Sequence, residues 1–115
     1  MIEASSRDAV ELLPLTPALF HVLLSLADGD KHGYAILKEV ETRTNGEVVL
    51  STGTLYGIIK RLLADGLIRA SASLSDERRT AYRLTAFGRR VALAEADRLR
   101  AMVATAKKLL QEPAV

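Results

Sequence analysis

The long helical pattern near the C-terminal end is the feature that most constrains what this chain can fold into. Thr85 offers a hydroxyl at a helix N-cap, and the residues after it are compatible with one helix to about Gln111, with Pro113 just past its end. Such a helix is about 39 Å long at 1.5 Å per residue. A chain of 115 residues forms one domain with a modest core. The helix is therefore expected to extend beyond that core.

Small and apolar side chains recur along this helix at spacings of 4, 3, 4, 3 and 4 residues, which is the a/d pattern of a coiled coil. Leu93, Met102 and Leu109 widen the stripe. One interpretation is that the stripe packs against the chain's own first helix. The length of the helix favours the other, a second copy of the chain as partner. The predicted dimer seam consists of Ala92, Ala96, Leu99, Val103, Ala106 and Leu110.

Start and stop signals divide the preceding residues into shorter helices. A short helix capped by Ser6 is expected before Pro14. The signals then predict one helix from Thr16-Pro17 to Asp28-Gly29-Asp30, a second from Lys31-His32-Gly33 to Asn45-Gly46, and a third from Ser51 or Thr52 to Asp65-Gly66.

Two short strands are predicted between the third helix and the long one. They span residues 67–73 and 80–84, with a polar connection at 74–79, and a further β-type run occupies 48–50. Three helices followed by a hairpin form the winged helix-turn-helix, so the expected class is mainly α with a small β-hairpin (α+β). We expect an N-terminal extension over 1–14, a winged helix-turn-helix domain over 15–85 and a dimerisation helix over 86–111.

The charge is unevenly distributed along the chain. Residues 1–50 carry four basic and eight acidic side chains, whereas residues 51–90 carry eight basic and three acidic ones, although the whole chain has a net charge of only +2. A basic middle segment favours a surface that faces a polyanion such as nucleic acid. A solvated basic face is the alternative, and charge alone does not separate the two.

The start of the third predicted helix resembles a DNA-reading element. It has the sequence S-T-G-T-L-Y over residues 51–56, so short hydroxyl side chains and a glycine occupy the first turn, where backbone N–H groups also face outward. Hydroxyls at such positions can contact phosphates or base edges. The alternative is that the first two hydroxyls only cap the helix and that Tyr56 is half-buried. The predicted contacts on this helix are Ser51, Thr52, Thr54, Tyr56, Lys60 and Arg61.

The predicted hairpin carries a second candidate contact. Arg78 and Arg79 lie at its descending edge, and arginine suits phosphate contact and a narrow minor groove. Ordinary solvation is the alternative, because Asp76 and Glu77 beside them can neutralise both charges.

Several classes of protein are not supported. There is no cysteine and no carboxylate cluster at ligand spacing, so we expect no metal site and no cofactor, and a reducing cytoplasm is the expected compartment. His21 and His32 are better explained by packing and by support of a turn than as ligands. No apolar run is long enough to span a membrane and no secretory signal is evident. No motif of a nucleophile or a phosphate-binding loop is present, so we expect no catalytic residues.

Four segments together resemble the PadR family of transcriptional regulators. They are L-T-P at 15–17, H-G-Y at 32–34, S-T-G-T-L-Y at 51–56 and R-R-T-A-Y-R-L-T at 78–85 with Gly88, so the resemblance covers about residues 12–90. It implies a winged-helix homodimer that usually represses genes by binding a near-palindromic DNA operator. It also implies that Tyr34 joins Ser51, Thr52, Thr54 and Tyr56 at the DNA face, with Arg78 and Arg79 on the wing.

The chain departs from the family pattern at two places. The family often has proline where this chain has Gly57, and glycine inside a helix costs about 1 kcal/mol relative to alanine, so a less rigid helix is expected. The predicted wing also lacks the glycines that are common in the family.

Two further questions follow from the resemblance. Some members release DNA on binding phenolic acids or flat hydrophobic drugs between the subunits. Phe20, Phe87 and Met102 are the candidates to line an apolar cleft for a small hydrophobic or aromatic effector at the dimer interface, although core packing is the better default for each. Tryptophan, on which the drug-binding members rely, is absent. The alternative function is a winged-helix protein-interaction module without DNA binding.

Overall fold

The computed structural model describes residues 8–76 and 78–111. Within these ranges the chain forms four α-helices, one 3₁₀ helix and three short strands, so the predicted α+β class is confirmed. In chain order the elements are η2 (Ala9–Leu12), α1 (Pro17–Ser25), β1 (Lys31–His32), α2 (Gly33–Arg43), α3 (Thr52–Ala64), β2 (Ile68–Ala70), β3 (Ala81–Leu84) and α4 (Ala86–Leu110).

The predicted starts of α1, α3 and α4 are confirmed by side-chain caps, whereas α2 starts after His32 without one. The Thr16 hydroxyl accepts the Leu19 amide at 3.2 Å. Ser51 rather than Thr52 caps α3, since its hydroxyl accepts the amide of Thr54 at 3.1 Å. Thr85 caps α4 by accepting the Gly88 amide at 2.9 Å. Each cap satisfies a backbone donor that has no partner inside its helix.

The predicted helix stops after α2 and α3 are also confirmed. Asn45 and Gly46 have φ of 58° and 81°, and Gly66 has φ of 76°, which is the left-handed conformation that ends helices. The N-terminal helix is present as η2, with Asp8 as its N-cap. The predicted cap Ser6 lies outside the described residues.

The three strands form one small antiparallel sheet in the order β1-β3-β2. Arg69 pairs with Arg83 in one ladder, and Lys31 pairs with Tyr82 in the other. The β-type run predicted at 48–50 is wrong: these residues pair with no strand and form an irregular link, in which Leu50 is buried in the core. The strand β1 is only two residues long and had no predicted counterpart.

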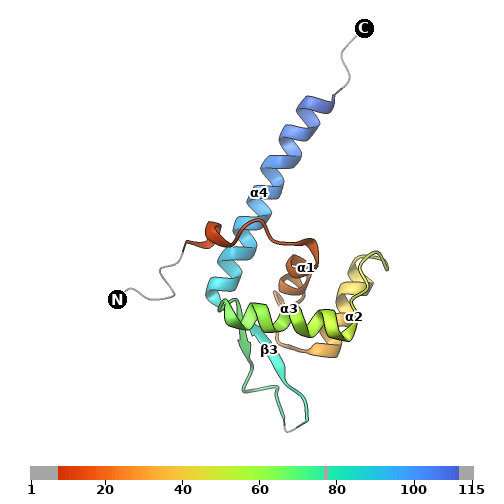
Figure 1. Cartoon of the computed structure of the whole chain (residues 1–115), viewed down its shortest axis with the longest axis vertical. Helices are drawn as coiled ribbons and strands as arrows, with labels where there is room; N and C mark the ends of the chain where they lie inside the picture. Colours follow the sequence, from red (N-terminus) through yellow and green to blue (C-terminus); the bar gives the residue numbers. More distant parts are fainter. Residues whose placement is uncertain (1–7, 77, 112–115) are drawn as a thin grey trace.

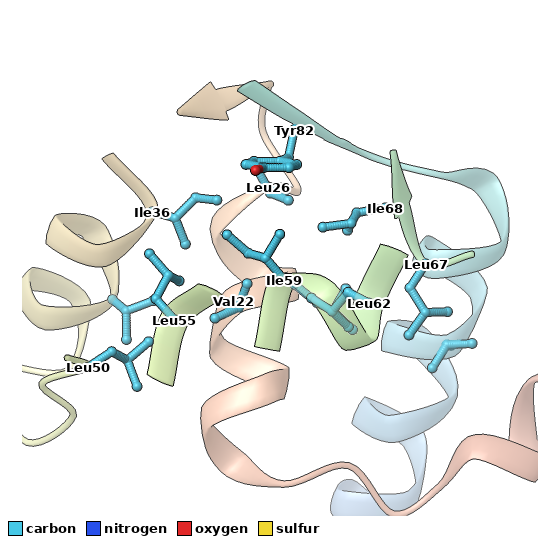
Figure 2. Packing of buried hydrophobic residues seen from close by; sticks show 13 residues of the cluster. Val22, Leu26, Ile36, Leu50, Leu55, Ile59, Leu62, Leu67, Ile68 and Tyr82 are labelled. Atoms are coloured by element: carbon cyan, nitrogen blue, oxygen red, sulfur yellow. The ribbon is translucent and has the colours of Figure 1, made fainter. Parts of the chain in front are cut away.

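The core lies where α1, α2 and α3 meet the sheet (Figure 2). The buried side chains of α3 are Leu55, Ile59 and Leu62, which recur at helical spacing. They face Val22 of α1 and Ile36 of α2. Burial of apolar surface at about 25 cal/mol per Å² is the main force that holds these elements together. It also fixes which face of α3 remains outside.

The helix α4 begins in the core and then leaves it. Val91 is fully buried, but the C-terminal half of the helix extends away from the rest of the described chain, on the opposite side from the β2–β3 hairpin (Figure 1). Near the point of departure, the buried Glu95 carboxylate accepts the Leu15 amide at 3.3 Å and two Arg98 N–H groups at 2.7 and 2.9 Å. These bonds, with that from Arg98 dominant, keep the pKa of Glu95 below its ordinary value despite burial.

Among the described residues, no helix combines the length and the apolar character needed to cross a membrane.

Candidate nucleic-acid interface

The outer face of α3 carries the side chains that the sequence pattern assigned to it. Thr52, Thr54, Tyr56, Lys60 and Arg61 are all exposed, while the apolar positions between them point into the core. Three of the predicted contacts on this helix, Ser51, Thr54 and Arg61, have partners within the chain. The Ser51 hydroxyl donates to Thr54 Oγ1 at 3.0 Å in addition to capping the helix. The Arg61 Nε lies 3.4 Å from an Asp65 carboxylate oxygen.

A groove of about 380 Å³ joins three elements that are far apart in the sequence. It lies between the start of α2, the side of α3 and the β2–β3 hairpin, hereafter the wing. Tyr34, Tyr56, Arg78 and Arg79 all line it, so four of the nine predicted DNA contacts come together. A smaller hollow of about 110 Å³ connects Thr52 with the same two tyrosines. Ser51, Thr54, Lys60 and Arg61 line neither.

The two tyrosines are unusually exposed for large aromatic residues. Tyr34 is 71% exposed and Tyr56 is 46% exposed. Tyr34 therefore does not serve the core of this chain, and Tyr56 contributes to it only in part. Aromatic side chains with a free hydroxyl suit contacts that are apolar at one end and polar at the other.

The tip of the wing is held by an aspartate. The backbone N–H groups of Arg78 and Arg79 donate to Asp76 Oδ1 at 2.9 and 2.8 Å, and the Asp76 amide donates to the Arg79 carbonyl at 2.9 Å. An aspartate that binds the backbone two and three residues further on closes a turn without glycine. This explains how a wing without the family's glycines still presents both arginines to solvent.

The wing-tip turn is expected to loosen in acid. Hydrogen bonds from the Arg78 amide and then the Arg79 amide lower the pKa of Asp76 below its ordinary value of 3.8. The turn is therefore stabilised above the ordinary pKa, and this contribution is lost as pH falls through the lower, folded-state pKa. The amide resonances of Arg78 and Arg79 should shift with a midpoint below 3.8. In an Asp76→Asn control that transition should disappear. A midpoint at or above 3.8 would contradict the assignment.

The base of the wing is tied to the α1–β1 turn by an ion pair that the sequence analysis did not find. Arg83 donates to Asp30 through Nε at 3.2 and 3.1 Å and through Nη2 at 3.0 Å, and the buried Ser71 hydroxyl donates to the same carboxylate at 2.5 Å. The bonds from Arg83 and then Ser71 lower the pKa of Asp30. Arg83 is thus engaged within the chain. Arg79 is engaged more weakly, since its Nη2 lies 3.8 Å from Asp76 Oδ2.

The predicted dimer seam on α4 changes in character along the helix. Ala92 is half-buried against the chain's own core, and Leu99 lines a groove with α1. Farther along, Val103 is 50% exposed and Leu110 is 79% exposed. Among the six seam residues, Ala96 is exposed and Ala106 is half-buried.

The groove between α1 and α4 has a volume of about 510 Å³. Phe20 and Met102 line it, together with His21, whose buried Nδ1 has no hydrogen-bond partner. The third residue predicted for an apolar cleft, Phe87, does not line this groove. It packs against the core, with the Arg90 guanidinium 5.5 Å above its ring.

In the part of the chain that the structure describes, no cluster of three or more histidine, cysteine or carboxylate side chains could hold a metal ion.

Comparison with known proteins identifies the family. The model of the transcriptional regulator PadR-like family matches residues 22–94, which is more than half of the chain. The chain belongs to the PadR family. It is a transcriptional regulator and not an enzyme, as the sequence motifs predicted.

Solved structures of transcriptional regulators share the fold. A transcriptional regulator from Clostridium thermocellum is 27% identical, with 81% of this chain and 92% of that chain covered and a TM-score of 0.70. A PadR family regulator from Clostridium difficile is 26% identical, covers 80% of this chain and 96% of its own, and has a TM-score of 0.65. The winged helix of this PadR chain is thus also found in regulators of the same kind.

A curated relative, an uncharacterized protein from Lysinibacillus sphaericus, is 33% identical over 70 residues. The match covers 59% of this chain and 64% of the relative.

Proposed function

We propose that this PadR protein is a sequence-specific, DNA-binding repressor that acts as a homodimer on a near-palindromic operator. The observation that carries the proposal is the groove in which Tyr34 and Tyr56 meet Arg78 and Arg79. Hydroxyls and arginines from a helix start and a wing are the groups that contact phosphates and base edges. The proposed DNA-binding unit spans 15–85, and the remaining predicted contacts, Ser51, Thr52, Thr54, Lys60 and Arg61, extend the surface along α3.

Two glycines leave part of the outer side of α3, the proposed recognition helix, without side chains, which supports a close approach of DNA. Gly53 and Gly57 lie one turn apart, so they share a face of α3, and a Cβ at either position would meet no atom of residues 8–76 and 78–111 within 4 Å. Each glycine costs the helix about 1 kcal/mol relative to alanine, and nothing inside the chain requires it.

The proposed dimer uses the part of α4 that leaves the core. Ala96, Val103 and Leu110 have little cover within the chain and recur at a spacing of seven residues. Pairing of two α4 helices would bury them, and it would bring two recognition helices to half-sites about one helical turn apart. In this arrangement Leu99 and Ala106 contribute from the seam's edge, and Ala92 mainly serves the chain's own core.

An effector would bind in the α1–α4 groove, and Phe87, the third residue predicted for the cleft, would take no part because it packs against the core. That groove is lined by Phe20 and Met102. A small hydrophobic or aromatic molecule matches such a surface. A DNA-binding regulator of this kind would work in the cytoplasm.

Variants of the wing distinguish the proposal from the alternative function, a protein-interaction module without DNA binding. The double variant Arg78→Ala/Arg79→Ala should weaken DNA binding about tenfold or more, and each lost phosphate contact should reduce the slope of log K against log salt by about 0.9. The matched control is Lys107→Ala/Lys108→Ala, which removes the same two charges in the last turn of α4. Equal losses in both variants would mean that only net charge matters.

A further inference from the structure

In the groove between α2, α3 and the wing, Gly33 leaves the space that the side chain of Tyr56 occupies. Gly33 is buried at the first residue of α2, and the end of the Tyr56 ring from α3 packs against it. A Cβ built on Gly33 would collide with the Tyr56 hydroxyl oxygen and would lie 3.0 Å from Cζ and 3.4 Å from Cε1. Tyr56 can occupy its observed position only because residue 33 has no side chain.

The backbone at Gly33 does not itself require glycine. The described glycines with positive φ are Gly29, Gly46 and Gly66, whereas Gly33 has an ordinary helical start. Alanine is preferred over glycine in a helix. The contact with Tyr56 is therefore the reason, within the chain, for glycine at position 33.

The contact restrains a side chain that is nearly half exposed to solvent. Tyr56 is 46% exposed, and it lines the same groove as Tyr34 and the two wing arginines. A methyl group at position 33 would press on the far end of a flexible side chain, which can swing outward without disturbing the core. Substitution there should change where the hydroxyl lies and should not change whether the chain folds.

We propose that Gly33 is a positioning residue for DNA recognition, which seats the Tyr56 ring at the floor of the groove and presents its hydroxyl to DNA in one place. The inference rests on the proposed DNA-binding function. A side chain that is already fixed loses less conformational entropy on binding, so the seat raises affinity without a contact of its own. Gly33 acts through Tyr56 and need not touch DNA.

A double-mutant cycle tests the proposal with Gly33→Ala, Tyr56→Phe and the combined variant, titrated against the DNA that the wild type binds. Gly33→Ala should weaken binding about tenfold, while its melting temperature stays within a few degrees of the wild type. In the Tyr56→Phe background the colliding oxygen is gone. The same alanine should then weaken binding by less than about threefold, because only a displacement of a few tenths of an ångström remains.

Each other outcome has a definite meaning. Wild-type affinity in Gly33→Ala, or an equal loss of affinity in both backgrounds, would contradict the proposal that Gly33 positions Tyr56. A loss of binding that accompanies a large fall in melting temperature would make Gly33 merely structural. Absence of wild-type DNA binding would refute the proposed function and the seat with it, whereas wild-type binding with an unaffected Gly33→Ala variant would refute the seat alone.

Discussion

Replacing Gly88 with alanine is expected to destabilise the fold by at least about 3 kcal/mol, the upper part of the range for overpacking a core. Gly88 is buried in the first turn of α4, and a Cβ there would collide with the Leu67 carbonyl oxygen and lie 2.9 Å from the Leu67 carbonyl carbon and Leu84 Cδ1. Unlike a tyrosine ring, a backbone carbonyl cannot swing aside. The Leu67 carbonyl is also the acceptor for both the amide and the hydroxyl of Thr85, so its displacement breaks the junction between α3, β2 and α4.

The measurement is thermal unfolding of Gly88→Ala beside a matched glycine-to-alanine control. The melting temperature should fall by more than about 10 °C in a domain of this size. In Gly57→Ala the added Cβ meets open space, so the melting temperature should hold or rise, in line with about 1 kcal/mol of helix propensity. A Gly88→Ala variant that melts with the wild type would contradict the close packing at this junction.

If the chain forms the proposed α4 dimer, replacing Ala96 or Val103 with glutamate is expected to convert it to monomers. Both residues lie on the proposed seam, where symmetry would place two carboxylates in one apolar interface, and neither belongs to the chain's own core. Sedimentation should show a single species of one chain's mass, with the helical content retained. Loss of the second half-site should weaken operator binding about 100-fold or more.

The matched control is Ala101→Glu, which makes the same substitution on the opposite side of α4. Ala101 is exposed and lies two residues beyond Leu99 of the seam, so it faces away from the proposed partner. It should leave the dimer intact. Dimers that persist in Ala96→Glu and Val103→Glu would place the interface elsewhere. Monomers in all three variants would attribute the effect to the added charge alone.

Local signals explain how much of this fold could be predicted. Caps such as Ser51 and Thr85, and stops such as Gly66, act within a few residues of chain, so most helix bounds could be predicted from the sequence. The first helix is an exception, because α1 ends at Ser25, before the stop predicted at residues 28–30. The apolar spacing on α3 also gave its exposed face. β1 was missed because a strand of two residues is defined only by its partner β3, which lies about fifty residues later in the chain.

The candidate site depended more on contacts between distant residues. The sequence indicated Tyr34, Tyr56 and the wing arginines separately, and only the packing of α2 and α3 against the sheet brings them to one groove. The Asp76 turn could have been predicted from an aspartate two residues before Arg78. The seat of Tyr56 on Gly33 could not, because the two residues lie on different helices.

Binding of the purified protein to DNA from upstream of its own gene tests the central claim most directly. The protein is titrated against that fragment and against a scrambled fragment at two salt concentrations. Tight binding to the upstream fragment alone, with log K falling by about 0.9 per phosphate contact for each unit of log salt, is the predicted result. Equal, weak binding to both fragments would mean that the protein binds these fragments only through a basic surface, without reading their sequence. No binding to either fragment at low salt would contradict the account and favour the protein-interaction module.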